Sequence, residues 1–332
     1  MLAMESKEDI EPEGVSRKVS GLPLLAGVFW GTAFPAIGLA LEGFSPLAVA
    51  FWRAVIGTVS LGGWLLATGA LTYRLAPGGW LRMGAIAMAG AGFFWAVQSV
   101  AVGLSTATNV AFLVAVYPAA VAVAAPPALG EKVKRANVVG LVLALAGAYL
   151  VISRGRILPL FTGESFNGDL LALAAAASFG TYIILGRLWQ PVIGVTPGGL
   201  SFYTFALSLP VLGVATALTG PFAGESGPVA IGALLWLGLV ASTGAFLALN
   251  YGMSRGAVAG SSVHLLAIPV VAAAVDWLLF RNTLTGAQWV GAALILLGIG
   301  ATAVRLPGFL GGRSSRRRDV LDTAQESEGG KV

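Results

Sequence analysis

Long apolar stretches, separated by short clusters of turn-forming residues, cover most of this chain. The separating clusters are rich in Gly, Pro, Ser and Glu, as at 76–79 and 224–227. A membrane-spanning helix needs about 20 apolar residues, and ten stretches approach or exceed that length. The predicted spans are 22–41, 47–69, 80–101, 106–127, 137–153, 168–188, 198–219, 228–252, 257–280 and 286–305. The pattern therefore predicts an all-α integral membrane protein with ten transmembrane helices.

The second half of this pattern repeats the first at an offset of 151 residues. Pro46 is matched by Pro197 and Pro118 by Pro269, and the glycines of the fifth span recur in the tenth. Five spans per repeat is an odd number, so the two repeats, at 22–153 and 168–305, must insert with opposite orientations. Two inverted five-helix repeats are an architecture common among secondary transporters. The residues between them, 154–167, are predicted to form an external linker.

Composition supports a lipid environment. Hydrophobic residues make up 57% of the chain and charged residues 11%, whereas soluble domains carry about 25% charged residues. The 46 glycines let helices approach closely, and we expect such seams at Gly140–Gly147 and Gly291–Gly298. They would pack either within the bundle or between subunits, so a homodimer stays open. The absence of cysteine excludes disulfides and thiolate metal sites.

The distribution of charge predicts the orientation. With both termini in the cytoplasm, 16 of the 20 lysines and arginines fall on the inner side and three on the outer side. The polar tails at 1–21 and 306–332 are then cytoplasmic, and the chain sits in the inner or plasma membrane of the cell. The formal charge of +5 is explained by this topology and does not indicate a nucleic-acid partner.

Several short motifs, repeated in order, carry a family resemblance over residues 22 to 305. They are Phe29-Trp30-Gly31-Thr32-Ala33-Phe34, Phe51-Trp52-Arg53, Leu129-Gly130-Glu131-Lys132 and the stretch Ala175 to Tyr182. With these motifs the chain resembles the EamA-type permeases of the drug/metabolite transporter superfamily. The resemblance implies ten helices, cytoplasmic termini and movement of small metabolites through a central cavity, but no particular substrate.

Polar and aromatic side chains inside the spans are the candidates for a binding cavity, because such polar groups are unfavourable in lipid. The candidates are Trp30, Gln98, Tyr117, Tyr182, Asn250, Ser262 and His264. Trp30 and Tyr182 fall near equivalent points of the two repeats. His264, the single histidine, lies five residues before Pro269, which frees a backbone carbonyl on the preceding turn. Each of these residues has an alternative role in helix packing or helix-to-helix hydrogen bonding.

Two charged residues are candidates for gating or coupling. Arg53 lies about seven residues into the second span, where it either faces an anionic substrate or is paired for structural reasons. Asp276 lies near the end of the ninth span and could take a coupling proton or act as a latch. An Arg53–Asp276 ion pair across the repeats would form an outer gate.

The expected function is secondary transport of a small polar metabolite, an amino acid or similar, most simply by export through alternating access. Export of lipophilic cations or drugs and a non-transporting structural or regulatory role are the alternatives. One histidine and no cysteine disfavour a metal site. No phosphate-binding loop, GxSxG or HExxH motif occurs, so neither an enzyme nor a cofactor is expected.

Overall fold

The computed structural model describes residues 22–71, 75–128, 133, 135–155, 164–248 and 261–303, without the side chains of 22–23, 261–266 and 302–303. All regular structure in these residues is helical. The first half contains α1 (Leu22–Ala40), α2 (Pro46–Ala67), α3 (Gly79–Ala87), the π-helix η1 (Met88–Gly92), α4 (Phe93–Leu104), α5 (Ala107–Val114), α6 (Tyr117–Ala128) and α7 (Arg135–Ser153). The second half contains α8 (Phe166–Ile193), α9 (Pro197–Thr219), α10 (Pro228–Leu235), the π-helix η2 (Trp236–Gly244), α12 (Ser261–Phe280) and α13 (Gly286–Ala303).

Seven helical segments are long and apolar enough to cross a bilayer. They are Pro46–Ala67, Gly79–Leu104, Ala107–Ala128, Arg135–Ser153, Phe166–Ile193, Pro197–Thr219 and Pro228–Ala248. Three shorter apolar helices, Leu24–Ala40, Ala267–Phe280 and Gly286–Ala301, accompany them among the described residues. Large hydrophobic side chains such as Leu81, Leu218 and Leu297 are exposed on the outside of the bundle. An all-helical membrane bundle is therefore shown, while the number of ten spans stays a prediction.

Equivalent helices of the two halves begin in the same way. Ser45 caps α2 by accepting a hydrogen bond from the Ala48 amide at 3.3 Å, and Thr196 caps α9 by accepting one from the Gly199 amide at 3.0 Å. A proline follows each cap at the first helical position, where a missing N–H leaves no hydrogen bond unmade. The caps fix where these two helices start and hence which of their residues reach the bundle centre.

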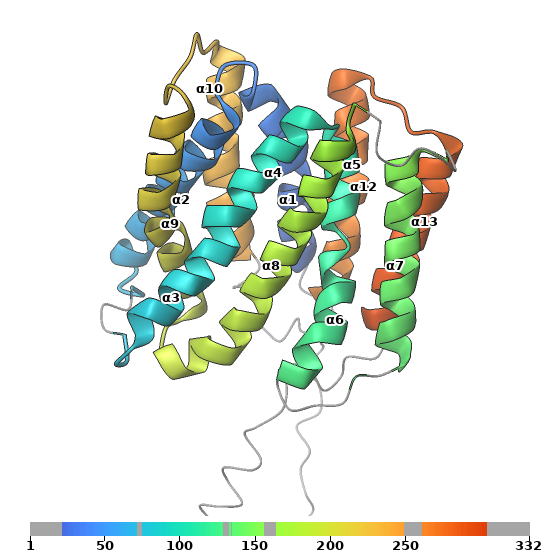
Figure 1. The fold of residues 1–332 in the computed structure, drawn as a ribbon. Helices are drawn as coiled ribbons and strands as arrows, with labels where there is room; N and C mark the ends of the chain where they lie inside the picture. Colours follow the sequence, from blue (N-terminus) through green and yellow to red (C-terminus); the bar gives the residue numbers. More distant parts are fainter. Residues whose placement is uncertain are drawn as a thin grey trace, which may run out of the picture.

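Helices of the first half pack mainly against helices of the second half. α1 contacts α12, α2 contacts α9, α4 contacts α8 and α7 contacts α13. Figure 1 shows α7 and α13 side by side at one edge of the bundle, while α4 and α8 run together across its face. Because the four most extensive helix pairings join the two halves, neither half buries its apolar surface alone.

The glycines of α7 and α13 form a close seam, as the sequence predicts, and it lies within this bundle. A Cβ atom at Gly298 would come within 2.9 Å of the Ala144 backbone nitrogen, and one at Gly291 within 3.0 Å of the Leu150 Cβ. These separations are shorter than normal van der Waals contact, so only hydrogen fits at these positions. A subunit interface, if the protein forms one, would have to use other surfaces.

Each half contains a π-helical segment at the same place in the repeat. Adding 151 to the bounds of η1, 88–92, gives 239–243, which falls inside η2 at 236–244. Gly90 of η1 packs against Tyr182 and Thr204, and Ser242 of η2 is hydrogen-bonded to Arg53. π-Helical turns are rare and often occur at functional sites. Both segments therefore face the centre of the bundle.

The α7–α13 seam gives a direct test of this packing. Gly298→Ala should destabilise the protein by about 1–3 kcal/mol, because the added methyl group overpacks against α7. Gly300→Ala on the same helix should leave stability unchanged or slightly raised, since its Cβ would meet open space and alanine favours the helix. Thermal unfolding of the detergent-purified variants measures both effects. Equal unfolding temperatures for the two variants would contradict the seam.

Candidate functional site

A pocket lies at the centre of the bundle, between the two halves. Of the residues that the structure describes, 18 from both halves line it, and most of them are apolar or aromatic. The free space inside is about 50 Å³, enough for a few water molecules, whereas small-molecule sites usually span about 300–1,000 Å³. In this conformation the described side chains therefore leave little open space in the pocket.

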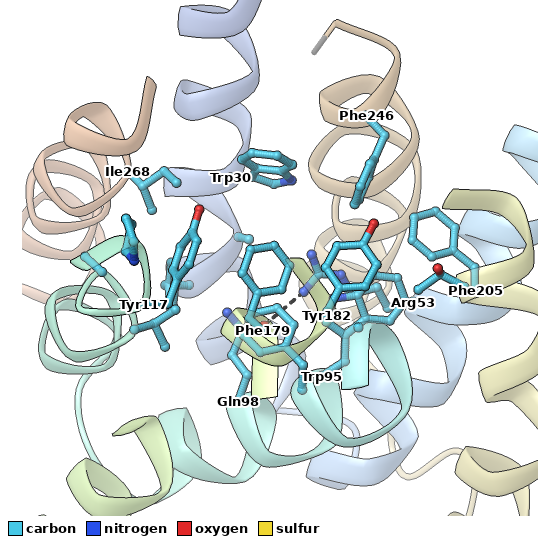
Figure 2. Close-up of a pocket in the computed structure, with 18 residues that line it drawn as sticks. Trp30, Arg53, Trp95, Gln98, Tyr117, Phe179, Tyr182, Phe205, Phe246 and Ile268 are labelled. Atoms are coloured by element: carbon cyan, nitrogen blue, oxygen red, sulfur yellow. Dashed lines mark hydrogen bonds between the residues drawn. The ribbon is translucent and has the colours of Figure 1, made fainter. Parts of the chain in front are cut away.

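Four of the seven predicted cavity residues lie on this wall. They are Trp30 of α1, Gln98 of α4, Tyr117 of α6 and Tyr182 of α8 (Figure 2). Asn250 lies outside the described residues, and the side chains of Ser262 and His264 lie outside the described part of α12. The structure thus brings together the four predicted residues that it describes.

Two groups of stacked and edge-on rings form most of the wall. Phe179 is central to the first, with ring centroids 4.7 Å from Phe94, 4.8 Å from Tyr117 and 5.4 Å from Tyr182. Trp30, Phe246, Phe205 and Trp95 form the second, with successive centroid distances of 5.5, 5.2 and 4.9 Å. Ring pairs at these separations are attractive beyond their apolar burial. The pocket therefore has walls suited to an apolar or aromatic group.

Arg53 supplies the only formal charge among the 18 lining residues. It is 4% exposed, its Nε donates to Ser242 Oγ at 3.0 Å, and its Nη1 donates to Gln98 Oε1 at 3.2 Å. Its guanidinium carbon also lies 4.4 Å from the centre of the Trp95 ring. No carboxylate of the described residues pairs with it. Among the described residues, Arg53 is thus a buried cation held by neutral groups.

Positions that are 151 residues apart meet on this wall with different chemistry. Three such pairs line the pocket: Arg53 with Thr204, Trp95 with Phe246, and Tyr117 with Ile268. Sequence reasoning missed Thr204, Phe246 and the central Phe179. For the first two, the repeat offset applied to Arg53 and Trp95 would have found them. No signal marks Phe179, because it is one apolar residue on a helix that is apolar on most sides.

The predicted ion pair between Arg53 and Asp276 is not formed. Asp276 is fully buried in α12, and its carboxylate accepts from Thr108 Oγ1 at 2.5 Å and from Asn282 Nδ2 at 3.3 and 3.4 Å. Arg281 instead places its guanidinium 5.5 Å from the Trp277 ring centre. The prediction was wrong for this conformation because opposite charge does not determine which way a helix turns its side chains.

A second buried carboxylate, which sequence reasoning did not single out, lies near the first. Asp169, in the first turn of α8, accepts from Ser105 Oγ at 2.5 Å and from Ser165 Oγ at 3.3 Å. Next to Thr108 in α5, Asn109 accepts from Gln288 Nε2 of α13 at 2.8 Å. These bonds tie α5 to its neighbours at one end of the bundle, which agrees with the packing role expected for buried amides.

A separate groove of about 570 Å³ lies between α5, α12 and α13. Val270, Trp277 and Trp289 on its wall are about half exposed on the outer surface of the bundle. It opens because consecutive helices diverge, with α12 packed on α1 and α13 packed on α7. Lying on the outside, this groove is distinct from the central pocket.

An all-helical bundle with an apolar exterior and a pocket enclosed between two similar halves is the architecture of a membrane transporter. The sequence model described as the EamA-like transporter family matches residues 19–153 and 166–304, and the chain belongs to that family. It is therefore a multi-pass membrane transporter, and the prediction of a transporter rather than an enzyme is confirmed.

Individual relatives agree with this class. An uncharacterized transporter of Archaeoglobus fulgidus is 26% identical over 263 residues, covering 78% of this chain and 88% of the relative. A probable terminal-alkyne amino-acid exporter of Streptantibioticus cattleyicolor is 28% identical over 286 residues, covering 83% and 90%. One solved crystal structure, 21% identical, matches with a TM-score of 0.62 over 87% of this chain and 99% of that chain, so the two share the fold.

Because the carboxylate of Asp276 is buried, removing the Thr108 hydroxyl that donates to it should lower the stability of the protein. Thr108→Val keeps the side-chain shape but removes a donor to a buried carboxylate, which should lower stability by about 1–3 kcal/mol. Thr181→Val is the matched control, since the exposed Thr181 hydroxyl bonds only to the Ala177 carbonyl of its own helix. Unfolding of the two purified variants measures the difference. A Thr108→Val protein as stable as the control would show that the bond contributes nothing.

Proposed function

We propose that this protein is a ten-helix secondary transporter that exports a small polar metabolite, an amino acid or similar, by alternating access. Two inverted five-helix repeats, 22–153 and 168–305, would flank the external linker 154–167. The tails at 1–21 and 306–332 would lie in the cytoplasm, and the chain would sit in the cell membrane. The pocket built from both halves is the observation that carries this proposal.

Repeat-related residues on opposite walls support alternating access. If two inverted repeats rock about a site held between them, residues at matching positions must face that site from both halves, as Trp95 and Phe246 do. The small open volume fits a conformation in which the described side chains leave no room for a bound solute. A small open volume alone would also fit a non-transporting protein. However, burying the charge of Arg53 and the amide of Gln98 in a membrane bundle is unfavourable, which favours a functional role for them.

The substrate proposal draws on a relative and on the pocket. The Streptantibioticus cattleyicolor relative is named a probable terminal-alkyne amino-acid exporter. The aromatic walls and the Gln98 amide suit a solute of that kind. A lipophilic cation suits the pocket less well, since Arg53 is the single formal charge on the described wall and would repel it.

Coupling to an ion is a separate part of the proposal. Asp276 stays the proposed coupling residue, because its buried carboxylate is held by two neutral donors. These are Thr108 of α5 and Asn282, which follows α12. Arg53 lies on the pocket wall, so we now place it at the binding site rather than at an outer gate.

Counterflow from liposomes tests the transport function. Liposomes containing the purified protein and loaded with a pool of amino acids and other metabolites should lose one compound class faster than empty liposomes, as followed by mass spectrometry. Ala115→Phe, which fills the pocket wall, should reduce this loss at least several-fold. Val214→Phe, on an exposed position of α9, should leave it unchanged.

Folding must be checked alongside transport. Both variants should elute as single species and unfold cooperatively, because overpacking a buried site carries a stability cost of about 1–3 kcal/mol. Absence of selective loss with folded wild-type protein would favour a non-transporting role. Equal loss of metabolite from liposomes with Ala115→Phe and with Val214→Phe would place the transport path outside this pocket.

A further inference from the structure

The guanidinium of Arg53 is positioned as a binding group. Ser242 of η2 holds Nε, Gln98 of α4 holds Nη1, and the Trp95 ring lies against its face. The side chain therefore reaches the pocket from α2 in one fixed orientation, set by groups from both halves. Its Nη2 amino group makes no hydrogen bond with a described residue.

No carboxylate of the described residues neutralises the charge itself. Removing a cation from water is unfavourable unless attraction inside the protein compensates for it. The ring contact and the two neutral acceptors offset part of that cost. These contacts hold Arg53 in place, but they do not neutralise its field. An anion entering the pocket would do so, and in a site shielded from water the attraction is strong.

The available donors match a carboxylate. An arginine fork binds the two oxygens of a carboxylate through parallel N–H bonds, which gives direction as well as affinity. Gln98, which also lines the pocket, accepts from Arg53 with its oxygen, so its amino group remains as a further donor. Figure 2 draws the Gln98–Arg53 bond as a dashed line among the aromatic side chains of the pocket.

The rest of the wall determines which group can lie beside the carboxylate of the solute. Aromatic rings from α1, α4, α6, α8 and α9 surround the space next to the guanidinium, and none of the described lining residues is acidic. An ammonium group on the solute would therefore meet no opposite charge on this wall, and the Arg53 cation would repel it. An apolar group would displace little water and pack against the rings.

Resting on the proposed transport function, we propose that Arg53 and Gln98 bind the carboxylate of the transported solute, whose apolar or aromatic body packs among the rings. The substrate class is then small carboxylic acids, amino acids among them, that carry an apolar or aromatic group. Amino acids belong to it through their carboxylate, and their amino group is not required. The carboxylate then contributes most of the binding affinity, and the apolar group adds to it.

Three ligands that share a phenylethyl group test this proposal by direct binding. 3-Phenylpropionate carries only the carboxylate, L-phenylalanine carries both charged groups, and 2-phenylethylamine carries only the ammonium. Titration of purified wild-type protein in detergent, by calorimetry or by the tryptophan fluorescence of the pocket, should give tight binding for the first two. The amine should bind at least tenfold more weakly, and 3-phenylpropionate at least as tightly as phenylalanine.

Variants then assign the effect to one residue. Arg53→Gln should weaken 3-phenylpropionate binding about 10- to 100-fold, the range for losing a charge-assisted hydrogen bond. Arg53→Lys, which keeps the charge but not the fork, should fall between wild type and Arg53→Gln. Arg281→Gln, at an exposed position away from the pocket, should leave binding unchanged. If Arg53→Gln does not fold, the order of the three ligands on wild-type protein decides.

Different results would contradict the carboxylate site and the transport function. Equal or tighter binding of the amine, or no binding of either carboxylate, would overturn the carboxylate site even if counterflow showed transport of another compound class. Carboxylate binding that depends on Arg53, without counterflow, would uphold the site and remove transport as its purpose.

Discussion

The buried charge of Arg53 constrains the arrangement of the whole bundle. An arginine in the middle of an apolar helix must find acceptors inside the protein, because lipid offers none. Its acceptors come from two other helices, Gln98 on α4 in the first half and Ser242 on η2 in the second. The ring of Trp95 adds a third contact. Helices from both halves must therefore meet around one side chain, and the aromatic pocket is what their remaining side chains enclose.

The sequence predicted the helices well, because their signals are local. Apolar length marks each span, and Ser45-Pro46 and Thr196-Pro197 mark two helix starts that the structure shows as capped. Intramembrane polarity and aromatic character also selected Trp30, Gln98, Tyr117 and Tyr182, which share one wall. Such residues are unfavourable in lipid, so chemistry alone indicates that they face inward.

Contacts between helices could not be predicted in the same way. α8 and α9 are apolar on nearly every side, so the sequence does not say which way Phe179 or Phe205 points. The same lack of direction led to the mistaken Arg53–Asp276 pair, where complementary charge suggested a contact and helix rotation prevented it. Asp276 instead bonds to Thr108 and Asn282, two neutral residues that no charge pattern identifies.

The two π-helical segments have a consequence for chain length. A π-helical turn holds about one residue more than an α-helical turn, so it takes up one extra residue without changing the phase of the helix that follows. One residue corresponds to about 100° around an α-helix. Deleting a single residue from Met88–Gly92 would return that segment to α-helical winding with Trp95 and Gln98 still directed at Arg53, whereas deleting Val97, in α4 itself, would turn Gln98 away from it. A change of one residue in length is therefore absorbed in these two segments, while in the α-helical turns beside them it displaces a side chain that lines the pocket.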